Sequence, residues 1–322
     1  MILTVTLNPL LERRKFFDEV ELGKSHRCKN EIYAAGGKGI NVSRQLNKFG
    51  IQNTAFTFLG GNNGKILRSV LTNEKINFTV QSTKSETRAA ELIIEENHQR
   101  VTTFFGLNND VTYEEAEEFK SKLDKMIQNC SIVVFSGSSP SESANSIFPY
   151  GIELAHKYDK ISILDTYGSH LEDCLNAAPT AVHNNREEIE KSLGISLKSE
   201  KEIRAYMNDL YAKGIKLIFI TDGDKPFYAA KFDFHYKIIP PAINVYDSTG
   251  SGDSFVAGIA YGLEKAMVFD EFIRIAAAAG SANASKLETS AVTVEEYSGL
   301  LELVRIEQIG KKMKIIDDTP RY

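Results

Sequence analysis

The sequence predicts an α/β protein with a doubly wound, mostly parallel sheet flanked by helices and a small β-sheet lid. Short apolar runs alternate with amphipathic stretches through most of the 322 residues, as in parallel βαβ units whose sheet is covered on both faces. Two segments, 11–34 and 86–105, break this alternation. At this length, one large domain with a small appendage is favoured over two equal domains.

The strands expected in the main sheet are short and rich in β-branched and aromatic residues. They are residues 2–7, 54–60, 131–137, 161–166, 180–184 and 216–221. Apolar residues at helical spacing predict helices at 38–50, 112–129 and 199–214. The α/β domain is therefore assigned residues 1–10, 35–85 and 106–322. The tail after about residue 305 is expected to be a solvated end.

The two interrupting segments predict the lid. Residues 11–34 have a charged, mixed pattern without a convincing helix, and residues 86–105 resemble two strands around a turn at EENHQR. Together they predict a small antiparallel sheet beside the ends of the parallel strands, where it would cover a crevice. Apolar lid residues are expected to meet a second subunit in a homodimer. These residues are Phe16, Phe17, Ile93 and Phe104.

Composition narrows the class of protein. A net charge of -5 argues against a nucleic-acid-binding surface. Three widely separated cysteines (Cys28, Cys130 and Cys174) predict reduced thiols and neither a disulfide framework nor a zinc site. No stretch has the length of an uncharged membrane span, and the first residues lack the basic start of a signal peptide. We therefore expect a cytoplasmic protein without nucleic-acid or membrane partners.

A glycine turn followed by a lone carboxylate occupies residues 248–255 (STGSGDSF). Gly250 and Gly252 let backbone N–H groups converge at the start of an apolar helix, whose dipole adds positive potential. In one interpretation, these N–H groups hold developing negative charge while Asp253 removes a proton from a hydroxyl that attacks phosphorus. In the other, the glycines form a tight turn and Asp253 caps the helix. The motif alone does not separate the two, because short glycine motifs are weak signals.

A second glycine turn lies in residues 34–44 (AAGGKGINVSR). Its glycines bring backbone close to a ligand, the Lys38 ammonium can neutralise phosphate, and the Asn41 amide can bond hydroxyls. The alternative is a strand-to-helix turn with a solvated Lys38. Two such turns in one α/β chain favour the interpretation as binding sites.

The order and spacing of three motifs resemble the PfkB (ribokinase-like) carbohydrate kinases. The motifs are TLNPLLE at the start, GGKGINVSR, and DSTGSGDSFVAG late in the chain. The first two resemble the branch that holds 1-phosphofructokinase and tagatose-6-phosphate kinase. Shorter stretches that also fit are FLGGNNG, ETR, SGSSP, DTYG, NREE and TDG, and the resemblance runs from about residue 3 to 290.

The resemblance implies a role for each residue that matches a family motif. Asp253 would be the catalytic base, and the anion hole would consist of Gly250, Ser251 and Gly252. The positions that match sugar-binding residues of the family are Glu12, Gly37, Lys38 and Asn41. Two arginines in the lid segments, Arg27 and Arg88, would hold the phosphate already on the sugar, since a planar guanidinium suits bidentate contact. Each arginine could instead be an exposed lid charge.

On the nucleotide side, the resemblance implies that the α/β domain binds ATP together with Mg²⁺. The matching positions are Asn185, Glu188, Thr221, Gly223 and Asn283. Glu188 would hold the metal indirectly, because Mg²⁺ prefers oxygen ligands and keeps several of its waters.

The chain departs from the family pattern at two informative places. The family usually reads NPAID where this chain reads NPLLE, so Glu12 replaces an aspartate and is longer by one methylene. His183 and Asn184 replace a Lys-Pro pair, and His183 is interpreted as a strand-end residue and not as a catalyst. Neither change removes Asp253 or Lys38, so activity is expected.

The hypothesis that follows is ATP-dependent phosphorylation of a ketohexose phosphate to the bisphosphate. Fructose 1-phosphate, which would give fructose 1,6-bisphosphate, ranks first and tagatose 6-phosphate second. One alternative is a kinase of an unphosphorylated sugar or nucleoside, which the two arginines disfavour. Another is a non-catalytic sugar-phosphate sensor, suggested by Glu12 and the altered nucleotide-side motifs.

Overall fold

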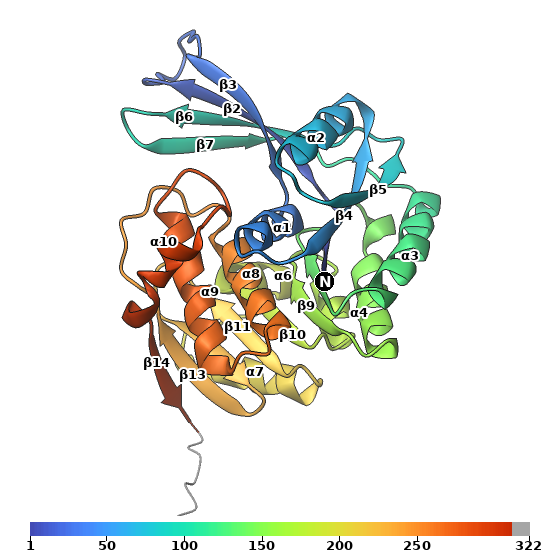
Figure 1. Cartoon of the computed structure of the whole chain (residues 1–322), viewed down its shortest axis with the longest axis vertical. Coiled ribbons are helices and arrows are strands. Elements are labelled where there is room, and N and C mark those ends of the chain that lie inside the picture. Colours follow the sequence, from blue (N-terminus) through green and yellow to red (C-terminus); the bar gives the residue numbers. More distant parts are fainter. Residues whose placement is uncertain (311–322) are drawn as a thin grey trace, which may run out of the picture.

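The computed structural model describes residues 1–310, and its main body is a ten-stranded sheet between two layers of helices (Figure 1). Across the sheet the order is β14 (Arg305–Ile309), β13 (Phe234–Ile239), β12 (Phe227–Lys231), β11 (Leu217–Thr221), β10 (Ala181–Asn185), β9 (Ile161–Asp165), β8 (Ile132–Ser136), β1 (Ile2–Thr6), β4 (Asn53–Gly60) and β5 (Phe78–Thr83). The seven strands from β11 to β5 are parallel, and β12, β13 and β14 continue the sheet antiparallel. The predicted fold class is confirmed.

All six strands expected in the main sheet are present, with ends shifted by one or two residues. Neither β5 nor the antiparallel edge was predicted, because these strands carry polar residues and lack a continuous apolar run. The expectation of a solvated end is wrong for residues 305–309, which form β14 and pair with β13. The rest of that tail, residues 311–322, lies outside the described residues.

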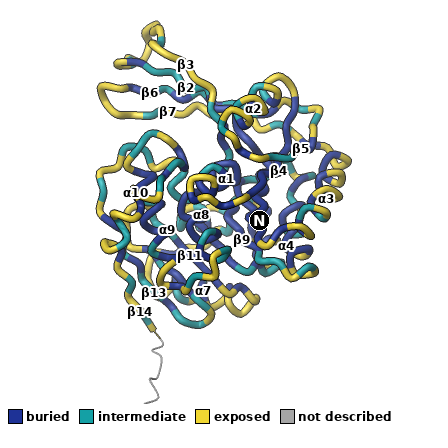
Figure 2. Tube along the Cα trace, in the orientation of Figure 1, coloured by how far each residue is buried: buried dark blue, intermediate teal, exposed yellow. Residues whose placement is uncertain are grey.

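Each face of the sheet has its own hydrophobic core, shown in dark blue in Figure 2. One face is covered by α1 (Lys38–Lys48), α8 (Ser251–Glu264), α9 (Phe269–Ala284) and α10 (Val294–Ser298). The other face is covered by α3 (Tyr113–Gln128), α4 (Ile147–Lys157), α5 (Leu171–Asn176), α6 (Arg186–Leu193) and α7 (Glu200–Ala212). The predicted helices at 38–50, 112–129 and 199–214 correspond to α1, α3 and α7. Two short 3₁₀ turns are Glu142–Ala144 and Leu301–Leu303.

The strand order reverses at β1. From β1 the chain first adds β4 and then β5 on one side, and later adds β8, β9, β10 and β11 on the other. In a doubly wound sheet the carboxyl ends of the strands at such a reversal border a crevice that binds ligands. Both glycine turns lie at this edge of the sheet, since α1 packs against α8 and against β1.

A second sheet of four strands projects from the main body (Figure 1). Its order is β3 (Asn30–Gly36), β2 (Leu10–Phe17), β6 (Ala89–Glu95) and β7 (Arg100–Phe105), and α2 (Gly61–Asn73) packs beneath it. The outer pairs are antiparallel, but β2 and β6 run parallel, so the expectation of a purely antiparallel sheet is wrong. Both hairpins leave the main body at the same end of the sheet, which makes their inner strands parallel.

The apolar residues of the small sheet differ in exposure. Phe17 is buried within the chain, whereas Phe104 and its neighbour Phe105 are 59% and 66% exposed. The three cysteines are free. Within residues 1–310, no helix has the length and apolar character that a membrane crossing requires.

Candidate active site

Asp253 lies in the first turn of α8, directly after the glycine turn. Its side chain is buried, and its Oδ2 accepts a 2.7 Å hydrogen bond from Nδ2 of Asn41 in α1. The N-cap of α8 is Gly250, with φ +80°, and no side chain caps this end of the helix. A Cβ at Gly250 would also collide with the Thr289 side chain. Asp253 is therefore buried against Asn41 and does not cap the helix.

The environment of Asp253 raises its pKa to about 7. Burial is the main cause, and the neighbouring Asp165 carboxylate acts in the same direction. The Lys38 ammonium and the hydrogen bond from Asn41 oppose both effects. A carboxylate with a pKa near neutral pH is well matched to accept a proton from an attacking hydroxyl.

The glycine turn before Asp253 presents backbone N–H groups at the positive end of the α8 dipole. The Ser251 N–H donates to the Ser248 carbonyl at 3.1 Å. In the part of the chain that the structure describes, the N–H groups of Gly250 and Gly252 have no hydrogen-bond partner. Two of the three N–H groups expected in the anion hole are therefore available to an anion.

Lys38 forms the centre of a charged cluster beside Asp253. Its Nζ lies 2.8 Å from Glu188 Oε1 and 3.2 Å from Asp165 Oδ1, and it sits 5.0 Å from the centre of the Tyr167 ring. Burial alone would lower the pKa of Lys38, but the two carboxylates outweigh it and raise that pKa above its usual value. The alternative of a solvated Lys38 is therefore wrong: the ammonium is charged and points into the site.

Asp165, the last residue of β9, and His183, in the middle of β10, extend this cluster. The Asp165 carboxylate accepts a hydrogen bond from Ser136 at 2.7 Å and lies 3.0 Å from His183 Nδ1. Burial would raise the pKa of Asp165, but Lys38 and the bond with His183 hold it well below its usual range. Nε2 of His183 lies 3.1 Å from Thr221 Oγ1. His183 thus joins the charged cluster to a residue expected on the nucleotide side.

Asn185 and Glu188 form a reciprocal capping arrangement in the first turn of α6. The Asn185 side chain caps the helix by accepting from Glu187 N–H at 2.8 Å, and Glu188 Oε2 accepts from the Asn185 N–H at 3.2 Å. This reciprocal capping fixes Glu188, whose other oxygen contacts Lys38. Gly223, by contrast, is exposed with open space around it.

Asn283 lies beneath the glycine turn of α8 and is 1% exposed. Its Nδ2 donates to the Thr249 carbonyl at 2.8 Å, and its Oδ1 accepts from the Ser290 N–H at 2.6 Å. All of its polar atoms therefore brace the turn from below. In this arrangement the side chain supports the glycine turn and is not exposed to an open pocket.

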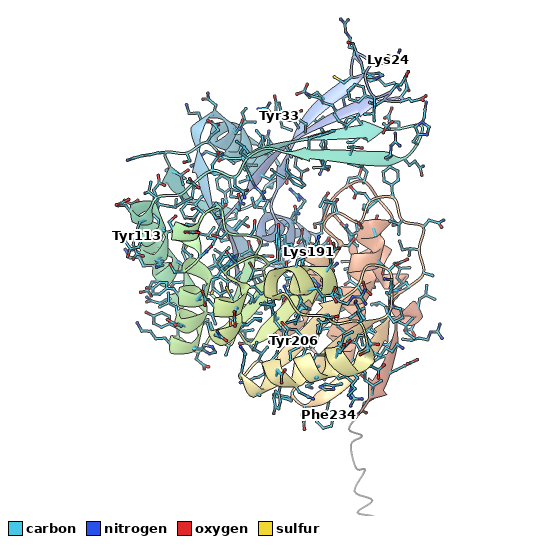
Figure 3. All side chains as sticks on the ribbon, turned by 180° about the vertical axis from the view of Figure 1, so that it is seen from behind. Lys24, Tyr33, Tyr113, Lys191, Tyr206 and Phe234 are labelled. Carbon is cyan, nitrogen blue, oxygen red and sulfur yellow. The ribbon has the colours of Figure 1, made fainter. Side chains whose placement is uncertain are left out.

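The two arginines expected on the sugar phosphate lie at opposite ends of the small sheet. Arg88 directly precedes β6, where its guanidinium donates to the Asn8 carbonyl at 3.0 Å. Arg27 is exposed in the loop beyond the other end of the β2–β3 ladder, near Lys24, which marks the tip in Figure 3. Six residues of strand separate the two ends, which is roughly 20 Å. The structure therefore does not bring Arg27 and Arg88 to one phosphate within a single chain.

Glu12 is held by a neighbouring arginine of the same strand. Arg14 donates to Glu12 Oε2 from Nε at 2.9 Å and from Nη2 at 2.7 Å, and Glu12 is 5% exposed. A Cβ at Gly36 would lie 2.5 Å from Glu12 Oε1. The extra methylene of glutamate thus fills the space that the glycine leaves, and Arg14 compensates the carboxylate charge.

The carboxylates at the carboxyl ends of the parallel strands are candidate ligands for a metal ion. Within residues 1–310, no group of three or more His, Cys, Asp or Glu side chains is placed to hold an ion. Glu188 is 25% exposed and rigidly placed beside the anion turn. Such a donor fits Mg²⁺ bound through its own waters and through phosphate oxygens, and does not fit a metal enclosed by protein ligands.

Comparison with known proteins places the chain in a family. The model of the pfkB family carbohydrate kinases matches residues 11–296. The chain belongs to the pfkB family. The tagatose-6-phosphate kinase of Staphylococcus epidermidis is 31% identical over 312 residues, which is 96% of this chain and 100% of the relative.

Solved structures of other pfkB-like kinases share the fold. A possible 1-phosphofructokinase from Thermotoga maritima is 26% identical with a TM-score of 0.87, over 96% of this chain and 99% of that one. The tetrameric inhibited form of phosphofructokinase-2 from Escherichia coli is 22% identical with a TM-score of 0.85, over 94% of this chain and 98% of that one. The ribokinase-like arrangement of main and small sheets predicted from the motifs is thereby confirmed.

Sequence reasoning missed several residues of this pfkB family site. Asp165 ends β9 and Tyr167 lies two residues beyond it, and their signal was that position, since the carboxyl ends of parallel strands gather at one edge. His183 was noticed but was given no partner. Arg14 and Arg44 were overlooked because a charged residue on a strand or helix is interpreted as solvent-exposed unless its partners are known.

The raised pKa of Asp253 predicts a pH-dependent gain in stability for Asp253→Asn. An aspartate titrates near 3.8 when unfolded and Asp253 near 7 when folded, so the folded state binds more protons between these values. The stability of wild type therefore falls as the pH rises from about 4 to about 7 and is constant above that, whereas the asparagine variant stays neutral. We expect the variant to melt a few degrees higher than wild type at about pH 8, with a smaller gain at about pH 5 and little difference near pH 4.

Thermal unfolding across this pH range measures the effect. Asp209→Asn, which changes an exposed aspartate of α7, serves as a control and should show no pH-dependent gain. Equal melting temperatures of wild type and Asp253→Asn at all pH values would show that the buried carboxylate ionises without cost.

Proposed function

We propose that this pfkB family kinase transfers the γ-phosphoryl group of ATP to a hydroxyl of a ketohexose phosphate, with Asp253 as general base. The observation that carries the proposal is the position of Asp253: a buried carboxylate with a pKa of about 7, next to a turn whose Gly250 and Gly252 N–H groups are available. A proton acceptor and an anion site side by side are what in-line attack of a hydroxyl on phosphorus requires.

In this proposal each step uses residues around Asp253 and Lys38, at the carboxyl ends of the parallel strands. The acceptor hydroxyl lies against Asp253 and loses its proton to Oδ1 or Oδ2 as its oxygen attacks the γ-phosphorus. The bond from the γ-phosphorus to the β,γ-bridging oxygen breaks at the same time, and ADP leaves. The Gly250 and Gly252 N–H groups and the Lys38 ammonium hold the charge on the transferred group. Mg²⁺, held through water by Glu188, would neutralise the nucleotide phosphates when bound. The small sheet acts as a lid that keeps water out and so limits ATP hydrolysis.

The acceptor that we propose first is fructose 1-phosphate, and tagatose 6-phosphate is the alternative. In furanose form, the two ends of a ketohexose present similar phosphate and hydroxymethyl groups, so one site shape suits both sugars. The relatives divide in the same way, one being a tagatose-6-phosphate kinase and the other a possible 1-phosphofructokinase. ADP release measured with a panel of phosphosugars and free sugars decides between them.

The base assignment predicts that Asp253→Asn abolishes turnover while leaving sugar-phosphate binding nearly unchanged. Loss of a general base lowers the rate by about 10²–10⁴-fold, because no other group takes the proton. For wild type, kcat/KM should rise with pH through about 7 as Asp253 loses its proton. Steady-state kinetics and calorimetric binding of the phosphosugar test both statements. A variant with near wild-type kcat would remove Asp253 from this role.

The acceptor class predicts a selective effect of Arg88→Ala. The Arg88 guanidinium interacts electrostatically with Tyr167, and Lys38 lies 5.0 Å from the centre of the same ring, so Tyr167 is a neighbour that both cations share. A hydrogen bond to a charged group contributes about 1.5–3 kcal/mol, and the KM for the phosphosugar should therefore rise about ten- to a hundredfold. The KM for ATP should change little. Efficient phosphorylation of free fructose by wild type would contradict the acceptor class.

We further propose a homodimer through the small sheets, which gives Arg27 a route to the phosphate. Arg27 lies roughly 20 Å along the sheet from Arg88, so it can join Arg88 at one phosphate only if it comes from a second copy of the chain. The exposed Phe104 and Phe105 supply apolar surface for such a contact.

Mixing two defective variants tests the shared site. Arg27→Ala should have a raised KM, and Asp253→Asn should be inactive. A mixed dimer combines the Asp253 of the first chain with the Arg27 of the second, so mixing and re-annealing should restore a low-KM activity. A monomeric mass in light scattering, or a mixture with the KM of Arg27→Ala alone, would contradict the proposal.

A further inference from the structure

Arg44 lies one helical turn beyond Asn41 on α1 and contacts it directly. Its Nη1 donates a 2.7 Å hydrogen bond to Asn41 Oδ1, and Asn41 Nδ2 in turn donates the 2.7 Å bond to Asp253 Oδ2. A continuous chain of two short hydrogen bonds therefore connects the guanidinium to the buried carboxylate. Arg44 is the last residue of the GGKGINVSR motif, but no role was predicted for it and the mechanism above does not use it.

The chemistry of the guanidinium, the amide and the carboxylate determines which group donates in each of the two hydrogen bonds. An amide has one acceptor end and one donor end, and the two ends can exchange by a half-turn of the side chain. A carboxylate only accepts, so it needs the donor end, and a guanidinium only donates, so it needs the acceptor end. Arg44 therefore holds the Asn41 amide with its NH₂ group toward Asp253. The reversed amide would face Asp253 with an oxygen and Arg44 with a second donor.

Arg44 is itself held in place on its other side. Nε lies 2.8 Å from Glu74 Oε2 at the end of α2. Nη2 donates to the carbonyl of Ala35 in β3, just before the glycine turn at residues 36–39. The Arg44 side chain is only 15% exposed. The guanidinium thus keeps a fixed orientation while one of its N–H groups remains directed at Asn41.

We propose that Arg44 is a positioning residue for the catalytic base, acting through the amide of Asn41. The inference rests on the proposed function, because it takes Asp253 to be the base. A purely structural reading of the same residue exists: the ion pair with Glu74 could simply tie α1 to α2. The two readings differ in what they predict for kcat, for the pH profile and for variants that lack Asn41.

Arg44→Met provides the main test, since it keeps the length of the side chain and removes every donor. Without the donor, the Asn41 amide is free to turn away, and kcat should fall about ten- to a hundredfold while the KM for ATP changes less than about twofold. The Asn41 hydrogen bond lowers the pKa of Asp253, so its loss should move the rise of kcat/KM to higher pH. Glu74→Gln, which breaks the ion pair but leaves Asn41 in contact, should keep kcat and the pH profile.

A double-mutant cycle separates positioning from general support of the fold. In an Asn41→Ala background, Arg44→Met should lower kcat by less than about twofold, because the group through which it acts is gone. Arg44→Lys keeps the charge but lacks the fork that reaches Glu74 and Asn41 together. It should show the same shift of the pH profile to a smaller extent, and it provides the test if Arg44→Met does not fold.

Two results would overturn the inference. One is a wild-type kcat and pH profile in Arg44→Met and Arg44→Lys, and the other is an equal loss of kcat with and without Asn41. Failure of the underlying function is distinguishable, because Asp253→Asn would then retain turnover. An inactive Asp253→Asn together with a normal Arg44→Met would remove only the role of Arg44.

Discussion

The burial of one carboxylate at the start of α8 is the constraint on which the rest of the site depends. Asp253 is removed from water and lies near a second buried carboxylate, Asp165, so ionising both is unfavourable. The fold offsets this with the Lys38 ammonium, the Asn41 amide and the positive end of the α8 dipole. These opposing effects leave the pKa of Asp253 near neutrality, whereas Asp165, which has the closer cation and two hydrogen bonds, stays ionised.

Thr289 connects the parts of the molecule that surround this carboxylate. Its hydroxyl accepts from Arg14 of the small sheet at 3.3 Å, and its backbone carbonyl lies 3.5 Å from Nη1 of Arg44. Its methyl group packs against Gly250, where a side chain would not fit. Thr289 thus links the small sheet to the glycine turn of α8 and to Arg44 through a few contacts, a path by which a movement of the small sheet would be transmitted to the surroundings of Asp253.

The features that could be predicted from the sequence were local ones. Contacts between segments that are far apart in the sequence could not be predicted. The two glycine turns and Asp253 are readable because backbone geometry restricts those positions to particular residues. Six of the seven parallel strands were predicted because they contain buried apolar runs, whereas β5 and the antiparallel strands β12, β13 and β14 carry polar residues and no such signal. The carboxylate partners of Lys38 lie 127 and 150 residues away, and Glu74, the ion-pair partner of Arg44, lies 30 residues away; pairing of that kind cannot be inferred from residue type. Arg27 and Arg88 were placed together because sequence gives no measure of how far a lid strand extends.

The ionisation of Asp253 can be observed directly, without reference to turnover. Difference infrared spectroscopy of wild type against Asp253→Asn isolates the carbonyl stretch of a protonated carboxyl group at this one position. With a pKa of about 7, that band should be present at about pH 5.5 and should disappear as the pH rises through about 7. A spectrum without the band at any pH at which the protein is folded would mean that Asp253 is always ionised, and the account of a buried, neutral-pH base would be contradicted.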